Sequence, residues 1–148
     1  MKVLKVGIAI LVAALAAGCA SGPAFNDMKD SFAPMMADQG RIYFYRTAMG
    51  GVAVQPSIYL NGQVVGKAVP GGFFYADRPS GNYEVSATTE AENKLTFTLE
   101  RAQTRYVRLD MNIGLFVGHI VPRLIDENDG AKEIQTTKFA GETPPKKP

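Results

Sequence analysis

Short segments in which apolar and polar residues alternate with a period of two recur along this chain, and this pattern most constrains its fold. The most regular ones are Tyr83–Thr88, Lys94–Glu100 and Tyr106–Met111. Because neighbouring side chains of a β-strand point to opposite faces, each segment is predicted to be a strand with one apolar and one solvated face. Such strands favour antiparallel sheets that pack against each other.

Two further segments complete this pattern. Arg41–Tyr45 and Ile58–Leu60 also alternate, and Asn61-Gly62 is the two-residue turn that most favours a hairpin, here into Gln63–Lys67. Turn residues recur between the strands, at Pro70–Gly72, Pro79–Gly81 and Glu92–Asn93. This spacing predicts an all-β, antiparallel β-sandwich of about seven or eight strands over residues 40–140.

The pattern changes after Met111. Ile113–Val121 is almost wholly apolar, which is typical of a strand buried on both faces and also of an exposed docking patch. Pro122–Asn128 is predicted to form a short helix that starts at proline and ends near Gly130. Lys132–Phe139 is expected to form the last strand, and residues 141–148, rich in proline and lysine, a disordered tail.

The first eighteen residues have the three parts of an export signal. Lys2 and Lys5 are followed by the apolar stretch Val6–Ala17 and by small residues. Twelve apolar residues rise only about 18 Å as a helix, well short of the roughly 30 Å hydrocarbon core of a bilayer. We therefore expect residues 1–18 to be a cleaved signal peptide rather than a permanent membrane span.

Cys19, the only cysteine, follows this segment directly. Ala16-Ala17-Gly18-Cys19 resembles the lipobox of bacterial lipoproteins, in which the cysteine thiol is diacylglycerylated and becomes the first residue of the mature protein. Acyl chains such as palmitate then hold the protein stably on a membrane. Ala20 and Ser21 follow instead of an aspartate, which by the resemblance implies the inner leaflet of the outer membrane, facing the periplasm.

Removal of the signal leaves 130 residues, which is enough for one domain. It also removes Lys2 and Lys5, so that 14 basic residues balance 14 acidic ones. The mature chain therefore has no excess of positive charge that would attract nucleic acid. Residues 19–39 are expected to be a lipidated tether with one short amphipathic helix, because Phe25, Met28 and Phe32 recur at helical spacing. Packing of this helix on the end of the sandwich is favoured over a partner-docking stripe.

No residue is predicted to be catalytic, to bind a cofactor or to ligate a metal. His119 is the only histidine, which excludes a multi-histidine metal centre. No local spacing pairs two carboxylates among Asp77, Glu84, Glu90, Asp110 and Glu133. Asp126–Gly130 is oxygen-rich but lacks the ligand spacing of a calcium loop and is read as a solvated turn. The protein is therefore expected not to be an enzyme.

Four tyrosines form the candidate binding face. If Tyr43, Tyr45, Tyr59 and Tyr75 share an outward sheet face, their rings can stack on the sugars of peptidoglycan or on a protein partner. Burial of two or more of them in the core, or in a cross-strand ladder, is the alternative.

Several stretches together resemble the bacterial lipoprotein family called domain of unknown function 2846, over about residues 40–137: Arg41–Arg46, Gln55–Gly62, Pro70–Phe74, Pro79–Val85, Tyr106–Arg108 and Gly114–Gly118. Pro79–Val85 is also similar to one hairpin of the PEGA and carboxypeptidase-regulatory β-sandwich modules. The family resemblance implies an envelope lipoprotein without an established activity. We therefore expect a non-enzymatic binding or assembly module that binds envelope proteins. Peptidoglycan binding is the alternative, and a hydrolase is a distant third.

Overall fold

The computed structural model describes residues 18–48, 53–87, 93–114 and 118–142. The predicted signal peptide up to residue 17, and residues 143–148 of the predicted tail, lie outside these ranges. The described residues form nine strands, two short α-helices and two 3-10 turns. In chain order these are α2 (Phe25–Met28), η1 (Lys29–Ser31), β1 (Gln39–Tyr45), β2 (Ser57–Leu60), β3 (Gln63–Lys67), β4 (Gly72–Pro79), β5 (Gly81–Ala87), β6 (Leu95–Leu99), β7 (Thr104–Ile113), β8 (Gly118–Ile125), α3 (Glu127–Glu133), η2 (Ile134–Thr136) and β9 (Lys138–Phe139).

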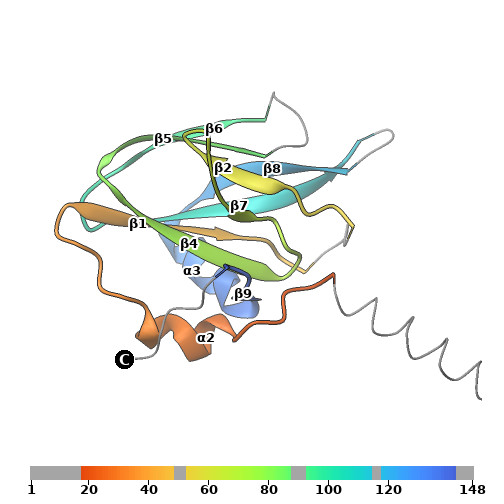
Figure 1. Cartoon of the computed structure of the whole chain (residues 1–148), viewed down its shortest axis with the longest axis horizontal. Coiled ribbons are helices and arrows are strands. Elements are labelled where there is room, and N and C mark those ends of the chain that lie inside the picture. The colour runs from red at the N-terminus through yellow and green to blue at the C-terminus, as the bar shows by residue number, and fades with distance from the viewer. Residues whose placement is uncertain (1–17, 49–52, 88–92, 115–117, 143–148) are drawn as a thin grey trace, which may run out of the picture.

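The strands form two sheets that pack face to face, as predicted (Figure 1). One sheet has the order β8-β7-β1-β4-β9 and the other the order β3-β2-β5-β6. The expectation of purely antiparallel pairing is wrong for the five-stranded sheet, because β1 pairs with β7, and β4 with β9, in parallel. These pairs join strands that are distant in sequence, so no tight hairpin dictates their direction.

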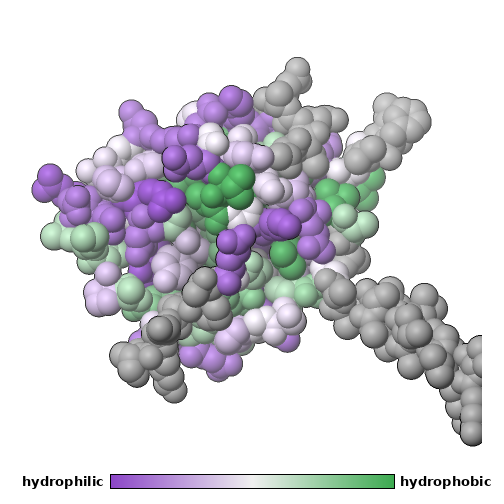
Figure 2. Space-filling model, viewed as in Figure 1, coloured by the Kyte–Doolittle hydropathy of each residue, from purple (hydrophilic) through white to green (hydrophobic). Residues whose placement is uncertain are grey.

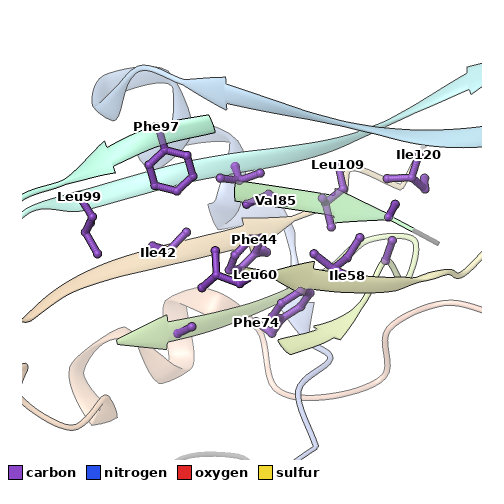
Figure 3. Packing of buried hydrophobic residues seen from close by; sticks show 14 residues of the cluster. Ile42, Phe44, Ile58, Leu60, Phe74, Val85, Phe97, Leu99, Leu109 and Ile120 are labelled. Atoms are coloured by element: carbon purple, nitrogen blue, oxygen red, sulfur yellow. The ribbon is translucent and has the colours of Figure 1, made fainter. Parts of the chain in front are cut away.

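The core between the sheets follows from the period-two pattern. Ile42 and Phe44 of β1 point toward the four-stranded sheet, where Leu60 and Val85 meet them (Figure 3). The rings of Phe44 and Phe74, on neighbouring strands, stack with centroids 4.9 Å apart. Burial of each such side chain stabilises the fold by about 1.5–3 kcal/mol.

A second apolar layer covers the outer face of the five-stranded sheet. Phe25 and Met28 of α2, together with Ile134 of η2, pack there against sheet residues. The members contributed by the sheet are all aromatic and buried: Tyr43, Tyr45, Phe73, Tyr106 and Phe139. The N-terminal helix is therefore packed, as favoured from the sequence, but on the face of a sheet rather than on the end of the sandwich (Figure 1).

The predicted helix at Pro122–Asn128 is wrong for its first half, because β8 continues through Ile125. Pro122 lies opposite Leu109 in the outermost strand of its sheet, where a residue without an N–H group is tolerated. The helix begins only at Glu127, and the side chain of Asp126 caps it by accepting a hydrogen bond from the Asp129 N–H at 3.1 Å.

Two other predictions need correction. Lys132–Phe139 is not one strand, because α3 and η2 occupy most of it and β9 has only two residues. Gly72 and Pro79, predicted as turn residues, begin and end β4, whose buried Phe73 and Phe74 do not alternate with polar residues. A strand buried on both faces has no period-two pattern to reveal it.

The apolar run Ile113–Val121 divides between two environments. Ile120 of β8 is buried in the core, whereas Ile113 at the end of β7 is 90% exposed. β7 and β8 pair from Tyr106–Ile125 to Ile113–Gly118 as an antiparallel hairpin. Residues 115–117, between the two strands in the sequence, lie outside the described residues. The run is thus neither one buried strand nor one exposed patch.

Replacing Gly130 by Ala tests the packing of α3 on the sheet. Alanine normally stabilises a helix interior by about 1 kcal/mol relative to glycine. Here a Cβ would overlap the side chain of Tyr106, so we expect a net loss of about 1–3 kcal/mol of unfolding free energy in denaturant titration. Gly81→Ala is the control, since the nearest atom to its Cβ is 4.0 Å away. Equal stability of the two variants would contradict this packing.

Candidate functional site

Cys19 is exposed at the start of the described chain, and the residues beside it are bound to the fold. The N–H of Ala20 donates to the carbonyl of Pro70, in the β3–β4 turn, at 3.1 Å. The side-chain amide of Gln55 donates to the carbonyl of Gly18 at 2.8 Å. The sulfur atom is therefore accessible, while its position relative to the sandwich is restricted by hydrogen bonds on both sides.

The chain after Ala20 then runs antiparallel to β9, and residues 23–25 pair with residues 137–139. This pairing is called the seam. The N–H of Phe139 donates to the carbonyl of Pro23 at 2.8 Å, and the N–H of Phe25 donates to the carbonyl of Thr137 at 3.0 Å. Ala24 and Lys138 form an antiparallel bridge between them. Gly22 allows this approach, because a Cβ there would overlap the backbone carbonyl of Phe139. The segment predicted as a tether is thus fixed to the domain where it leaves Cys19.

A shallow pocket of about 340 Å³ lies beside Cys19. Its described lining comprises Cys19–Pro23, Gln55, Val69 and Phe139–Gly141, none of which is charged. Such a lining has space for the base of a modified cysteine side chain. It provides neither a carboxylate nor a histidine for acid–base chemistry or metal binding.

The four predicted tyrosines do not form an exposed platform, and this prediction needs correction. Tyr43 and Tyr45 do lie on the outer face of β1, but they are buried there at 7% and 0% exposure. Tyr75, beside them on β4, is half-buried, with its ring centroid 5.0 Å from that of Phe32. Tyr59 belongs to the other sheet. The period-two pattern assigned Tyr43 and Tyr45 to the outer face of β1 correctly, but it revealed neither that Tyr59 belongs to the other sheet nor that the N-terminal segment and α3 cover this face.

Arg41 links the covering segment to the sheet. Its guanidinium forms a bidentate ion pair with Asp77, at 2.7 and 2.8 Å, and donates to the carbonyl of Ala33 at 2.7 Å. It also lies over the ring of Tyr75, 4.5 Å from the centroid. Burial alone would lower the pKa of Arg41, but its hydrogen bonds to Asp77 and its other partners outweigh burial and raise it. The Arg41 guanidinium therefore has a structural role, because it holds the segment at Ala33 against the sheet.

A second polar network attaches α3 to the sheet. The hydroxyl of Tyr45 donates to Glu133 at 2.6 Å, and Arg108 donates to both oxygens of the same carboxylate at 2.9 and 3.0 Å. Arg108 and Arg123 both pair with Asp110. Burial alone would raise the pKa of Glu133, but the hydrogen bonds from Tyr45 and Arg108 outweigh it and hold the pKa below its ordinary value. Glu133 is therefore held as a structural carboxylate rather than a proton donor.

The remaining sequence candidates are separate from one another. His119 is half-buried in β8, opposite Asn112, and Glu84 pairs with Lys94 on the surface. Glu90 lies outside the described residues. Within the described ranges, no group of three or more histidine, cysteine, aspartate or glutamate side chains is placed to hold a metal ion. No helix in the described part of the chain is long and apolar enough to cross a bilayer.

Sequence reasoning missed the seam and the Glu133 network. The seam uses backbone groups of ordinary residues, so Gly22 was its only local signal. The network joins Tyr45 to Glu133, which are 88 positions apart in the sequence, and local sequence patterns do not predict contacts at such a separation.

These features define the class of protein: a small β-sandwich in which the residues on either side of the exposed Cys19 are hydrogen-bonded to the fold. The chain belongs to the family of proteins of unknown function DUF2846, whose model matches residues 36–120, which confirms the family predicted from the motifs. It is also similar to an uncharacterized protein of Haemophilus influenzae, at 28% identity over 137 residues that cover 91% of this chain and 81% of the relative. No solved structure matches the chain.

Glu133→Gln tests the polar network through its pH dependence. Because the folded-state pKa of Glu133 is lowered, its stabilising effect is present above the ordinary pKa of 4.5 and is lost as the pH falls through the folded value. We expect the loss of unfolding free energy in Glu133→Gln to be largest near neutral pH and to shrink in acid. Glu142→Gln, at an exposed position, is the control. A loss of the same size at all pH values would contradict the network.

Proposed function

We propose that this protein is a lipid-anchored lipoprotein of the bacterial envelope. Residues 1–18 direct its export, and Cys19 receives the acyl chains and becomes the first residue of the mature protein. One observation carries the proposal most: Cys19 is exposed directly after the apolar segment, and the described strands and helices, with all but one of the hydrogen bonds that hold this segment, lie after it. Everything before Cys19 can therefore be removed without loss of any described strand or helix.

Ala20 and Ser21 place the protein, in this proposal, on the inner leaflet of the outer membrane, facing the periplasm. Two or more acyl chains hold a protein stably on a bilayer, whereas one chain holds it only marginally. The mature chain has balanced charge, so we assign its attachment to the acyl chains rather than to a polybasic surface.

We further propose a non-enzymatic role as a binding or assembly module. The charged side chains on the outer face of the five-stranded sheet support this role, because they are neutralised by ion pairs: Arg41 with Asp77, and Arg108 with Asp110 and with Glu133 of α3. Glycan binding loses its main support, since Tyr43 and Tyr45 are buried. Envelope proteins are therefore the favoured partners.

Cys19→Ser tests the anchor. We expect the native protein to sediment with outer-membrane vesicles, to incorporate labelled palmitate and to show an intact mass raised by the acyl groups. Cys19→Ser is expected to lose the label and the raised mass, since serine has no thiol for lipidation. Ser21→Ala is the matched control and keeps both. An unmodified Cys19 thiol in the native protein would overturn the proposal.

Incubation with isolated cell wall tests the favoured role against glycan binding. We expect no saturable retention of the purified lipoprotein on peptidoglycan, and the same result for Tyr59→Ala, because Tyr59 does not share a sheet with the other three tyrosines. Chemical cross-linking in intact cells is expected to trap envelope proteins instead. Saturable retention that Tyr59→Ala abolishes would reverse the preference.

A further inference from the structure

The proposed point of lipid attachment, Cys19, is separated from the folded domain by almost no free chain. In the proposed mature protein Gly18 is removed, but the hydrogen bond from the Ala20 N–H to Pro70 and the seam from Pro23 to Phe139 remain. Only one peptide unit, about 3.8 Å between Cα atoms, then separates Cys19 from a residue bonded to the fold. Acyl chains on Cys19 would therefore hold this end of the sandwich at the bilayer surface.

The β7–β8 hairpin projects from the same end of the molecule. The N–H of Arg46, the residue after β1, donates to the carbonyl of Gly72, two residues from Pro70, so β1 ends near the Cys19 attachment. β7 runs parallel to β1, and the last pair between them is Tyr45–Arg108. β7 continues five residues farther, to Ile113, which corresponds to about 16 Å. Figure 1 shows the hairpin extending on the side where the chain enters the domain.

The end of this hairpin carries apolar surface beyond the core. Val107 and Leu109 are buried, Met111 is partly buried, and Ile113, next in the same row of alternate residues, is 90% exposed. The row that packs the core thus continues into residues that the core does not bury. Figure 2 shows hydrophobic residues at this end of the molecule, in addition to a hydrophobic patch near the centre of the same face.

We infer that Ile113, the last residue of β7, is a second membrane contact, and that its side chain enters the interface of the bilayer that holds the Cys19 acyl chains. This inference rests on the proposed lipid anchor. A single exposed isoleucine binds a membrane weakly when the protein is free in solution. Once the anchor holds the domain at the surface, the contact becomes intramolecular and its effective concentration rises. The sandwich then has a defined orientation, with the opposite end of β4, at the Pro79–Gly81 turn, directed into the periplasm.

A single introduced tryptophan tests the contact, because the chain contains none. Ile113→Trp is compared with Leu124→Trp, an exposed apolar position on the same hairpin, six residues from Gly118 and so about 20 Å back along β8. Each lipoprotein is purified with its acyl chains and reconstituted into phosphatidylethanolamine–phosphatidylglycerol vesicles whose acyl chains are brominated. We expect the Ile113→Trp emission to shift to the blue and to lose about half its intensity, and the Leu124→Trp emission to remain unchanged.

Two controls on the same samples separate this inference from the anchor. Intact mass shows whether Cys19 is acylated, and flotation shows whether the protein is attached to vesicles. Acylated, attached protein with unquenched Ile113→Trp overturns the membrane contact while the anchor stands. Equal quenching at both positions overturns the defined orientation. An unacylated thiol in the native protein overturns the anchor and, with it, the inference.

Discussion

The five-stranded sheet is apolar on both faces, and the rest of the molecule is arranged around that constraint. In β1, Ile42 and Phe44 face the core between the sheets, while Tyr43 and Tyr45 face the other way, and all four are buried. Exposure of the outer aromatic layer would cost about 1.5–3 kcal/mol for each large side chain. The four-stranded sheet covers one face, and among the described residues the N-terminal segment, α3 and η2 cover the other.

This cover has consequences at both ends of the N-terminal segment. Near Phe32, Arg41 is enclosed by aromatic rings and is neutralised by Asp77. At the other end, the seam with β9 places Cys19 beside the β3–β4 turn. The same packing that buries the tyrosines therefore removes a binding platform and fixes the chain next to Cys19, the proposed attachment point. In the proposed function, the protein acts through the position at which the anchor holds its domain.

Local patterns predicted those parts of the fold that are determined locally. The Asn61-Gly62 turn has both residues in the left-handed region, at φ 48° and 79°, and joins β2 to β3 as expected. β5, β6 and β7 follow the alternation read from the sequence. β4 was missed because its buried Phe73 and Phe74 are adjacent, and the start of α3 was misplaced because Pro122 lies in an edge strand. For the tyrosines, alternation determines the face of a strand but not what packs on that face.

Amide hydrogen exchange on the acylated protein measures the attachment most directly. The account predicts that the N–H groups of Ala20 and Phe139 are protected for as long as those in the middle of β1, because both are hydrogen-bonded between the N-terminal segment, the β3–β4 turn and β9. Exchange at these two amides at the rate of an unstructured chain, while β1 stays protected, would show a loose tether and contradict the account.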